Sequence, residues 1–100
     1  MSLRDRQSVF AKRVALLILF AYERGYEVTF GDAYAHDGHI DESFHYKRMA
    51  IDLNLFRNGK YLTSTADHKP LGDFWESIGG TWGGRWDDGN HYSQDEGRRK

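Results

Sequence analysis

Histidine and aspartate residues between positions 45 and 91 have the types and the spacing to bind a metal ion and activate water. His45 precedes Asp52 by seven positions, and Asp88 precedes His91 by three. Two histidines and one carboxylate form a common catalytic zinc set, which leaves a fourth position for water. Zinc lowers the pKa of that water to about 7, and a neighbouring carboxylate can accept its proton. The chemistry that this set could perform is hydrolysis.

The spacing of His45 and Asp52 restricts the backbone between them. On a straight helix, seven residues rise about 10 Å, which is too far for two donors that each lie about 2 Å from one zinc. On an unbroken strand, an odd separation sends the two side chains to opposite faces. Both can bind one metal only if the chain bends or bulges between them, near Lys47 and Arg48. Taken alone, such a pair is more often two surface residues.

The turn Asp88-Gly89-Asn90-His91 could supply a third ligand, His91, and a general base, Asp88. Asp87 is expected to point away, because the side chains of neighbouring residues usually diverge. A solvated acidic turn is the simpler interpretation of this stretch when nothing else is considered.

Composition narrows the classes of protein to which the chain could belong. Its 100 residues predict one domain over residues 1–100. It has no cysteine, so disulfides, thiolate nucleophiles and cysteine-ligated zinc are excluded, and a metal needs histidine and carboxylate ligands. A net charge of −1 lacks the basic footprint of nucleic-acid binding.

An amphipathic helix is predicted over about residues 6–24, with Gly25 as its C-cap. Four apolar residues recur at helical spacing: Phe10, Val14, Leu17 and Ala21. A signal peptide is the alternative, since basic residues precede the apolar run 14–22 and Ala33-Tyr34-Ala35 has the form of a cleavage site. Charged residues close the run, and it is too short to span a membrane, which favours a retained helix.

Residues 49–56 alternate as a half-buried strand does. The odd positions are large and apolar and are expected to face the core, whereas Asp52 lies on the other face. Asn58-Gly59 predicts a type I′ turn into a strand at 60–62, and another strand is expected at 26–30.

Pro70 could open a short helix that Gly79-Gly80 ends, and a last strand is expected near His91. His68 lies in a polar loop and is expected to be exposed, while Trp86 fits a core and a groove equally well. Together the elements predict a small single α+β domain, with a mostly antiparallel sheet and the N-terminal helix packed on it.

The order of the candidate residues resembles the zinc D-alanyl-D-alanine carboxypeptidase and phage L-alanyl-D-glutamate endopeptidase family. That family's pattern is S-x-H-x6-D, followed late in the chain by E/D-x-x-H and an aromatic residue. The chain has Ser43-x-His45-x6-Asp52 and Asp88-x-x-His91-Tyr92. Three further stretches look like phage and prophage members: residues 25–34, 50–56 and 82–86. The resemblance implies a zinc peptidase fold like that of Hedgehog proteins and D-Ala-D-Ala peptidases.

The resemblance also implies a role for each matching residue. His45, Asp52 and His91 match the zinc ligands, and Asp88 matches the catalytic carboxylate. Ser43 matches the motif serine, which would steady the substrate or the loop.

One position departs from the family. Phage members usually carry arginine directly after the Asp-Ala-Tyr stretch, where this chain has Ala35. An arginine in that region is thought to bind the substrate and to stabilise the developing oxyanion. Arg48 or Arg85 could take over this substrate contact.

The implied function is a zinc metallopeptidase that hydrolyses peptidoglycan stem peptides, as a phage or prophage endolysin does. The L-Ala–D-Glu bond is favoured over D-Ala–D-Ala trimming. The alternative is a non-catalytic, zinc-containing module of the same fold that binds cell-wall peptide. We expect Zn2+ as cofactor and a monomer that binds peptidoglycan peptide but neither nucleic acid nor, by stable insertion, a membrane. Without a signal peptide, it would stay in the host cytoplasm before release and act at the cell wall or periplasm.

Overall fold

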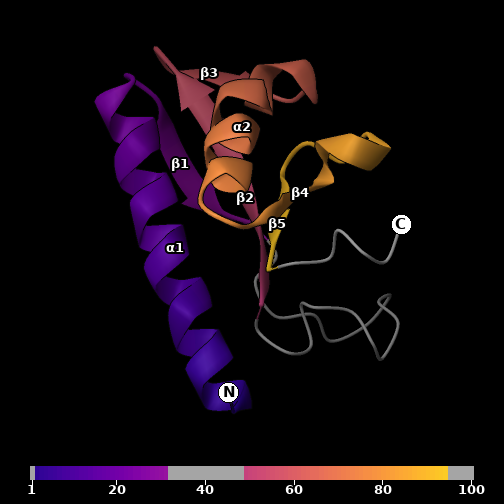
Figure 1. Cartoon of the computed structure of the whole chain (residues 1–100). Coiled ribbons are helices and arrows are strands. Elements are labelled where there is room, and N and C mark those ends of the chain that lie inside the picture. The colour runs from indigo at the N-terminus through magenta and orange to yellow at the C-terminus, as the bar shows by residue number, and fades with distance from the viewer. Residues whose placement is uncertain (1, 32–48, 95–100) are drawn as a thin grey trace.

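The computed structural model describes residues 2–31 and 49–94 (Figure 1). These residues form two α-helices, α1 (Leu3–Glu23) and α2 (Lys69–Ser77). They form the strands β1 (Glu27–Phe30), β2 (Ala50–Arg57), β3 (Lys60–Leu62), β4 (Thr81–Trp82) and β5 (His91–Ser93). Two short 3-10 helices complete the described part, η1 (Ala66–His68) and η2 (Gly83–Trp86).

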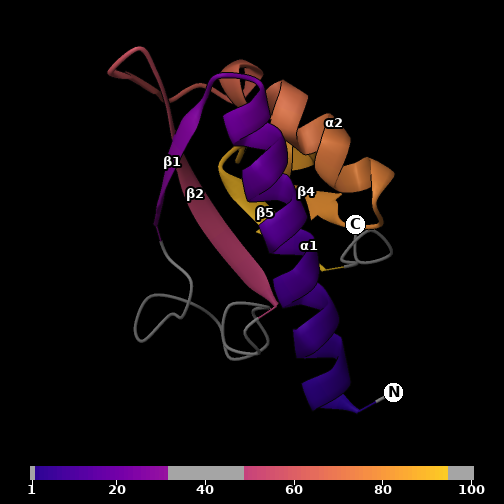
Figure 2. The same cartoon turned by 90° about the vertical axis from the view of Figure 1, so that its left-hand side faces the viewer.

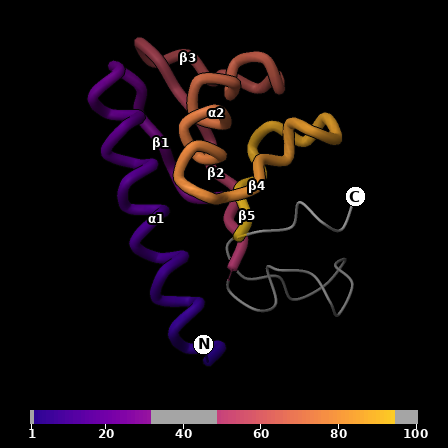
Figure 3. Tube along the Cα trace, in the orientation of Figure 1, coloured from indigo at the N-terminus to yellow at the C-terminus, as the bar shows by residue number. Residues whose placement is uncertain are grey.

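β2 is the central strand of an antiparallel sheet. The strand order is β1-β2-β5-β4, and β3 pairs with the end of β2. Figure 3 follows the chain from β2 into β3, through η1 and α2, and back along β4 and β5. Because β2 pairs with three other strands, its register decides which of their side chains face one another.

Both helices pack on one face of the sheet. Figure 2 shows β1 and β2 on one side and α1 and α2 on the other. The core between these layers contains the four helix residues that periodicity predicted, Phe10, Val14, Leu17 and Ala21. At the helix start, the Ser2 side chain accepts a hydrogen bond from the Asp5 N–H at 3.0 Å. Past its end, Gly25 has a positive φ of 88°, as expected of a C-cap.

The alternation in β2 is confirmed. Ile51, Leu53 and Leu55 are buried in the core, whereas Asp52 and Asn54 are only partly buried on the opposite face. Asn58 and Gly59 both have positive φ, 53° and 78°, which is the backbone of the predicted type I′ turn.

The predicted second helix is also present, with Pro70 in its first turn. Its Trp75 is fully buried and joins α2 to two strands, because its Nε1 donates to the carbonyl oxygens of Thr81 at 3.2 Å and Ser93 at 2.9 Å. The described residues therefore form the predicted α+β domain, with an N-terminal helix on a mostly antiparallel sheet.

One expectation is wrong, and another concerns residues that the structure does not describe. His68 is not exposed: only 2% of its surface is accessible, because it packs beneath Tyr92 of β5. The signal-peptide alternative placed its cleavage site at residues 33–35, outside the described residues. In the described part of the chain, no helix is long and apolar enough to cross a membrane.

Leu17 tests how much the contact between α1 and the sheet stabilises the fold. Its side chain is fully buried, so Leu17→Ala should lower the free energy of unfolding by about 2–5 kcal/mol. Leu19 lies on the same helix and is 61% exposed, so Leu19→Ala should change it by about 0.5 kcal/mol or less. Chemical denaturation of the two variants measures the difference, and equal effects would contradict the packing described here.

Candidate metal centre

Asp52 and His91 face each other across the sheet. Their Cα atoms are direct partners in the antiparallel pairing of β2 and β5. The Nδ1 atom of His91 lies 3.4 Å from the Oδ1 atom of Asp52, and the two side chains are 12% and 24% exposed. Both stand on the sheet face opposite the helices, since their neighbours Ile51 and Tyr92 are buried in the core. Two predicted ligands, 39 positions apart in the chain, thus meet at one point.

The separation of these two atoms fits a shared ion. Nitrogen and carboxylate oxygen each bind zinc at roughly 2.0–2.2 Å, so two such donors at a tetrahedral angle lie about 3.3–3.5 Å apart. The observed 3.4 Å agrees with that value. A direct hydrogen bond between these atoms would usually be shorter, about 2.7–2.9 Å for a charge-assisted pair. Donor chemistry and distance therefore both suit a zinc ion.

The turn before His91 is tied to the sheet by several hydrogen bonds. Asp88 N–H donates to the Gly83 carbonyl at 2.9 Å, and His91 N–H donates to the Asp88 carbonyl at 3.1 Å. The Leu53 N–H donates to the Asn90 carbonyl at 2.9 Å. A side chain at Gly83 would collide with the Asp88 carbonyl oxygen, so glycine is needed where η2 folds onto this turn. These contacts hold the position of His91 opposite β2.

The two neighbouring aspartates of the turn have different surroundings. Asp87 Oδ1 accepts a hydrogen bond from the Thr65 hydroxyl at 3.0 Å, so its carboxylate is directed to the loop before η1. Asp88 is exposed, and its backbone is fixed by the hydrogen bonds to Gly83 and His91. The divergence of the two side chains and the catalytic role of Asp88 stay predictions.

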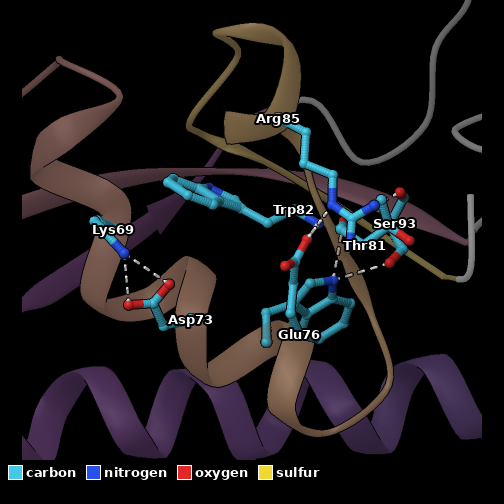
Figure 4. A network of polar contacts seen from close by, with 8 residues as sticks. Lys69, Asp73, Glu76, Thr81, Trp82, Arg85 and Ser93 are labelled. Atoms are coloured by element: carbon cyan, nitrogen blue, oxygen red, sulfur yellow. Dashed lines mark hydrogen bonds and ion pairs between the residues drawn. The ribbon is translucent and has the colours of Figure 1, made fainter. Parts of the chain in front are cut away.

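Arg85 is held by α2. Its Nε donates to Glu76 Oε2 at 2.8 Å, and the same oxygen accepts the Trp82 N–H at 3.1 Å. Figure 4 shows the Glu76 carboxylate between these two partners. This contact anchors η2 to α2. The substrate-binding role suggested for Arg85 stays a prediction.

Trp86 lies beside the pair on its exposed side. Its ring is 46% exposed, and its centroid lies 5.9 Å from that of His91 at an interplanar angle of 56°. Sequence left open whether this tryptophan belonged to the core or to a groove; the structure places it at the surface, next to the predicted ligand.

The remaining predicted site residues, Ser43, His45 and Arg48, lie outside the described residues. Within residues 2–31 and 49–94, no group of three histidine, aspartate or glutamate side chains is placed to hold one ion. The described part therefore contributes two donors, Asp52 and His91, and the assignment of His45 as the third stays a prediction.

A buried hydrogen bond supports the strand that carries His91. His68 Nδ1 lies 2.8 Å from the Tyr92 hydroxyl, and the Leu62 backbone accepts a hydrogen bond from the same imidazole. A neutral imidazole has one donor and one acceptor nitrogen, so if the other ring nitrogen donates to Leu62, Nδ1 accepts a hydrogen bond from the Tyr92 hydroxyl. Burial lowers the pKa of His68 despite Asp67 nearby, and burial raises the pKa of Tyr92. Both groups are therefore neutral at pH 7.

The lowered pKa of His68 predicts a loss of stability in mild acid. The unfolded chain binds a proton at His68 below about pH 6.5, whereas the folded chain resists it, so the free energy of unfolding falls as the pH drops from 6.5 towards 5. His68→Gln removes the titrating group and should flatten this part of the profile. Denaturation of both proteins at several pH values, compared as a difference, measures the effect; identical slopes would show that His68 does not titrate on unfolding.

Comparison with known families gives a match over the second half of the chain. The family model described as D-alanyl-D-alanine carboxypeptidase matches residues 37–94, which is more than half of the chain. This range contains Asp52, Asp88 and His91 together with His45 and Ser43. No curated protein matches the chain.

Proposed function

Because the chain belongs to the D-alanyl-D-alanine carboxypeptidase family, we propose that it is a zinc-dependent peptidase that hydrolyses the stem peptides of peptidoglycan. The observation that carries the proposal is the cross-strand pair of Asp52 and His91, whose donor atoms are 3.4 Å apart. Family membership supports a peptidase, and the spacing of the pair supports the zinc.

Three protein ligands would hold the ion. Asp52 and His91 supply an oxygen and a nitrogen from adjacent strands, and His45 is proposed as the third ligand. When bound, zinc would supply an activated water and polarise the scissile carbonyl. The antiparallel pairing fixes two of these ligands before any metal arrives, which reduces the cost of ordering them.

The chain's own residues would move the proton. Asp88 takes a proton from the attacking water and delivers it to the leaving amine, as a general base and then a general acid. Its carbonyl is bound by the His91 N–H, so the backbone of the base and that of the ligand are coupled. Trp86, exposed beside His91, could cover part of the path by which the substrate reaches the metal and exclude water around the substrate.

We propose the L-Ala–D-Glu bond as the first candidate for cleavage, with the D-Ala–D-Ala bond as the second. The phage-like stretches of sequence support an endolysin that acts at the cell wall after release from the host cytoplasm. The peptide Ala-D-Glu-Lys-D-Ala-D-Ala contains both bonds, so one substrate can separate the two specificities.

Tandem mass spectrometry of the products should identify the bond, because the two possible tetrapeptides have the same mass and differ only in the order of their residues. Zinc-loaded protein incubated with this pentapeptide should release alanine and a tetrapeptide if the first bond is cut, or a tetrapeptide and D-alanine if the last is cut. A chelator should stop the reaction. An intact pentapeptide after incubation with folded, zinc-loaded protein would contradict a peptidase and favour the peptide-binding module.

A further inference from the structure

The sheet face that carries Asp52 continues along β2 as a row of partly exposed polar and aromatic side chains. Asp52, Asn54 and Phe56 alternate with the buried residues of the strand and therefore share one face. Both helices lie on the other face, as Figure 2 shows. The row is thus continuous with the Asp52–His91 pair.

Neighbouring strands widen this row. Tyr61 of β3 is the direct partner of Phe56, stacks on its ring with centroids 5.1 Å apart, and is 54% exposed. The Tyr61 hydroxyl donates to Asn54 Oδ1 at 3.4 Å, and Asn54 Nδ2 donates to the Thr29 hydroxyl at 3.2 Å. The Asn54 amide is therefore oriented from both sides, while an exposed aromatic surface lies next to it.

The face also has a charge suited to one kind of ligand. Glu27 is exposed and is the direct partner of Phe56 in β1, so its carboxylate belongs to the same face of the sheet. Stem peptides carry a basic residue, lysine or diaminopimelate, at their third position. Whether the first or the last bond is cut, that residue is second from the scissile bond, so its long side chain would extend along the row to bring its amino group to this carboxylate.

The length of the row matches the length of a stem peptide. From Asp52 to Phe56 the strand advances four residues, or about 13 Å. An extended peptide covers about 3.3–3.6 Å per residue, so four residues span the same distance. In a pentapeptide, cleavage at the first or at the last bond leaves four residues on one side of the cut. The match therefore holds for either bond.

We propose that the face formed by Asn54, Phe56, Tyr61, Thr29 and Glu27 binds, in an extended form, the four stem-peptide residues that lie on one side of the scissile bond. The proposal rests on the proposed function and adds to it a preference for long peptides over dipeptides. Asn54 bonds the peptide backbone, the Tyr61 ring packs against an apolar part of the peptide, and Glu27 pairs with the basic third residue.

Equilibrium binding tests this face without relying on turnover. Calorimetric titration of folded, zinc-loaded Asp88→Asn protein with Ala-D-Glu-Lys-D-Ala-D-Ala gives a Kd for an uncleaved peptide. Adding Tyr61→Ala should raise this Kd by about three- to tenfold, the usual contribution of one aromatic contact. The Kd values for Ala-D-Glu and D-Ala-D-Ala should rise less. Adding Leu19→Ala is the control, because Leu19 is 61% exposed on α1, on the other side of the sheet.

Glu27→Gln tests the charge separately. It should weaken binding of the lysine peptide but not of the same peptide with acetylated lysine, since only the first carries the amino group. Equal Kd values for Tyr61→Ala and Leu19→Ala, or an effect of Glu27→Gln that is the same for the acetylated peptide, would overturn the proposal. If wild-type protein binds the pentapeptide in this pattern but never cleaves it, the peptidase function fails and the binding face stands. If neither the wild type nor any variant binds the pentapeptide, the proposed binding face is wrong.

Discussion

Replacing His91 with alanine should remove most of the bound zinc. Wild-type protein purified without chelator is expected to hold close to one equivalent per chain, because a three-ligand zinc site binds tightly at neutral pH. His91→Ala deletes one of the two donors that the structure brings together at 3.4 Å. Elemental analysis after exhaustive dialysis measures the loss, and hydrolysis should fall with it.

Two further variants separate ligation from a general effect on folding. Asp52→Asn keeps the size of the side chain but replaces the anionic ligand by a neutral amide, so it should also lose zinc. His36→Ala removes a histidine that is not among the predicted ligands and should keep it. Circular dichroism should show the same fold for all the proteins. Full zinc retention by His91→Ala would show that the ligand assignment is wrong.

Local patterns were sufficient to predict most of the elements. Val14 and Leu17 recur on one helical face, and apolar residues alternate along β2. Both patterns arise because one side of the element is buried, so the spacing of apolar residues in the sequence predicts them. The same holds for the turn at Asn58 and Gly59, whose positive φ values few other residue pairs adopt easily. Such features depend on residues close together in the chain.

Long-range contacts were harder to predict. His68 was expected at the surface because its sequence neighbours are polar, yet it is buried through its bond to Tyr92, 24 residues later. The strand at Thr81 and Trp82 was missed because two residues show no periodicity. That Tyr92 faces the core could have been inferred, since it follows a ligand expected on the other face. Its hydrogen-bond partner, His68, could not be inferred from the sequence.

In the candidate site, too, local patterns were predictable and long-range contacts were not. Spacing and resemblance selected Asp52 and His91, but only the pairing of β2 with β5 makes them direct partners. The environment of Arg85 depends on Glu76 of α2, a contact that no motif in the sequence indicates. Trp86 was left undecided because tryptophan is usually a core residue, whereas its nearness to Asp88 in the sequence suits a groove.

Loss of the general base should have the largest effect on turnover with the least effect on structure. Asp88→Asn keeps the shape and the hydrogen-bonding ability of the turn residue but removes its basicity, so kcat should fall by about 10²-fold or more while zinc and stability are kept. Asp87→Asn is the matched control: its side chain contacts Thr65, and an amide oxygen can still accept that hydrogen bond, so activity should change little.

Steady-state kinetics on the pentapeptide, together with metal analysis, decides between them. Equal losses in the two variants, or release of zinc by Asp88→Asn, would contradict the division of roles between base and ligand. If wild-type protein holds zinc but does not turn over, Ala35→Arg becomes the decisive variant, because regained hydrolysis would show that the missing arginine, and not Asp88, limits the reaction.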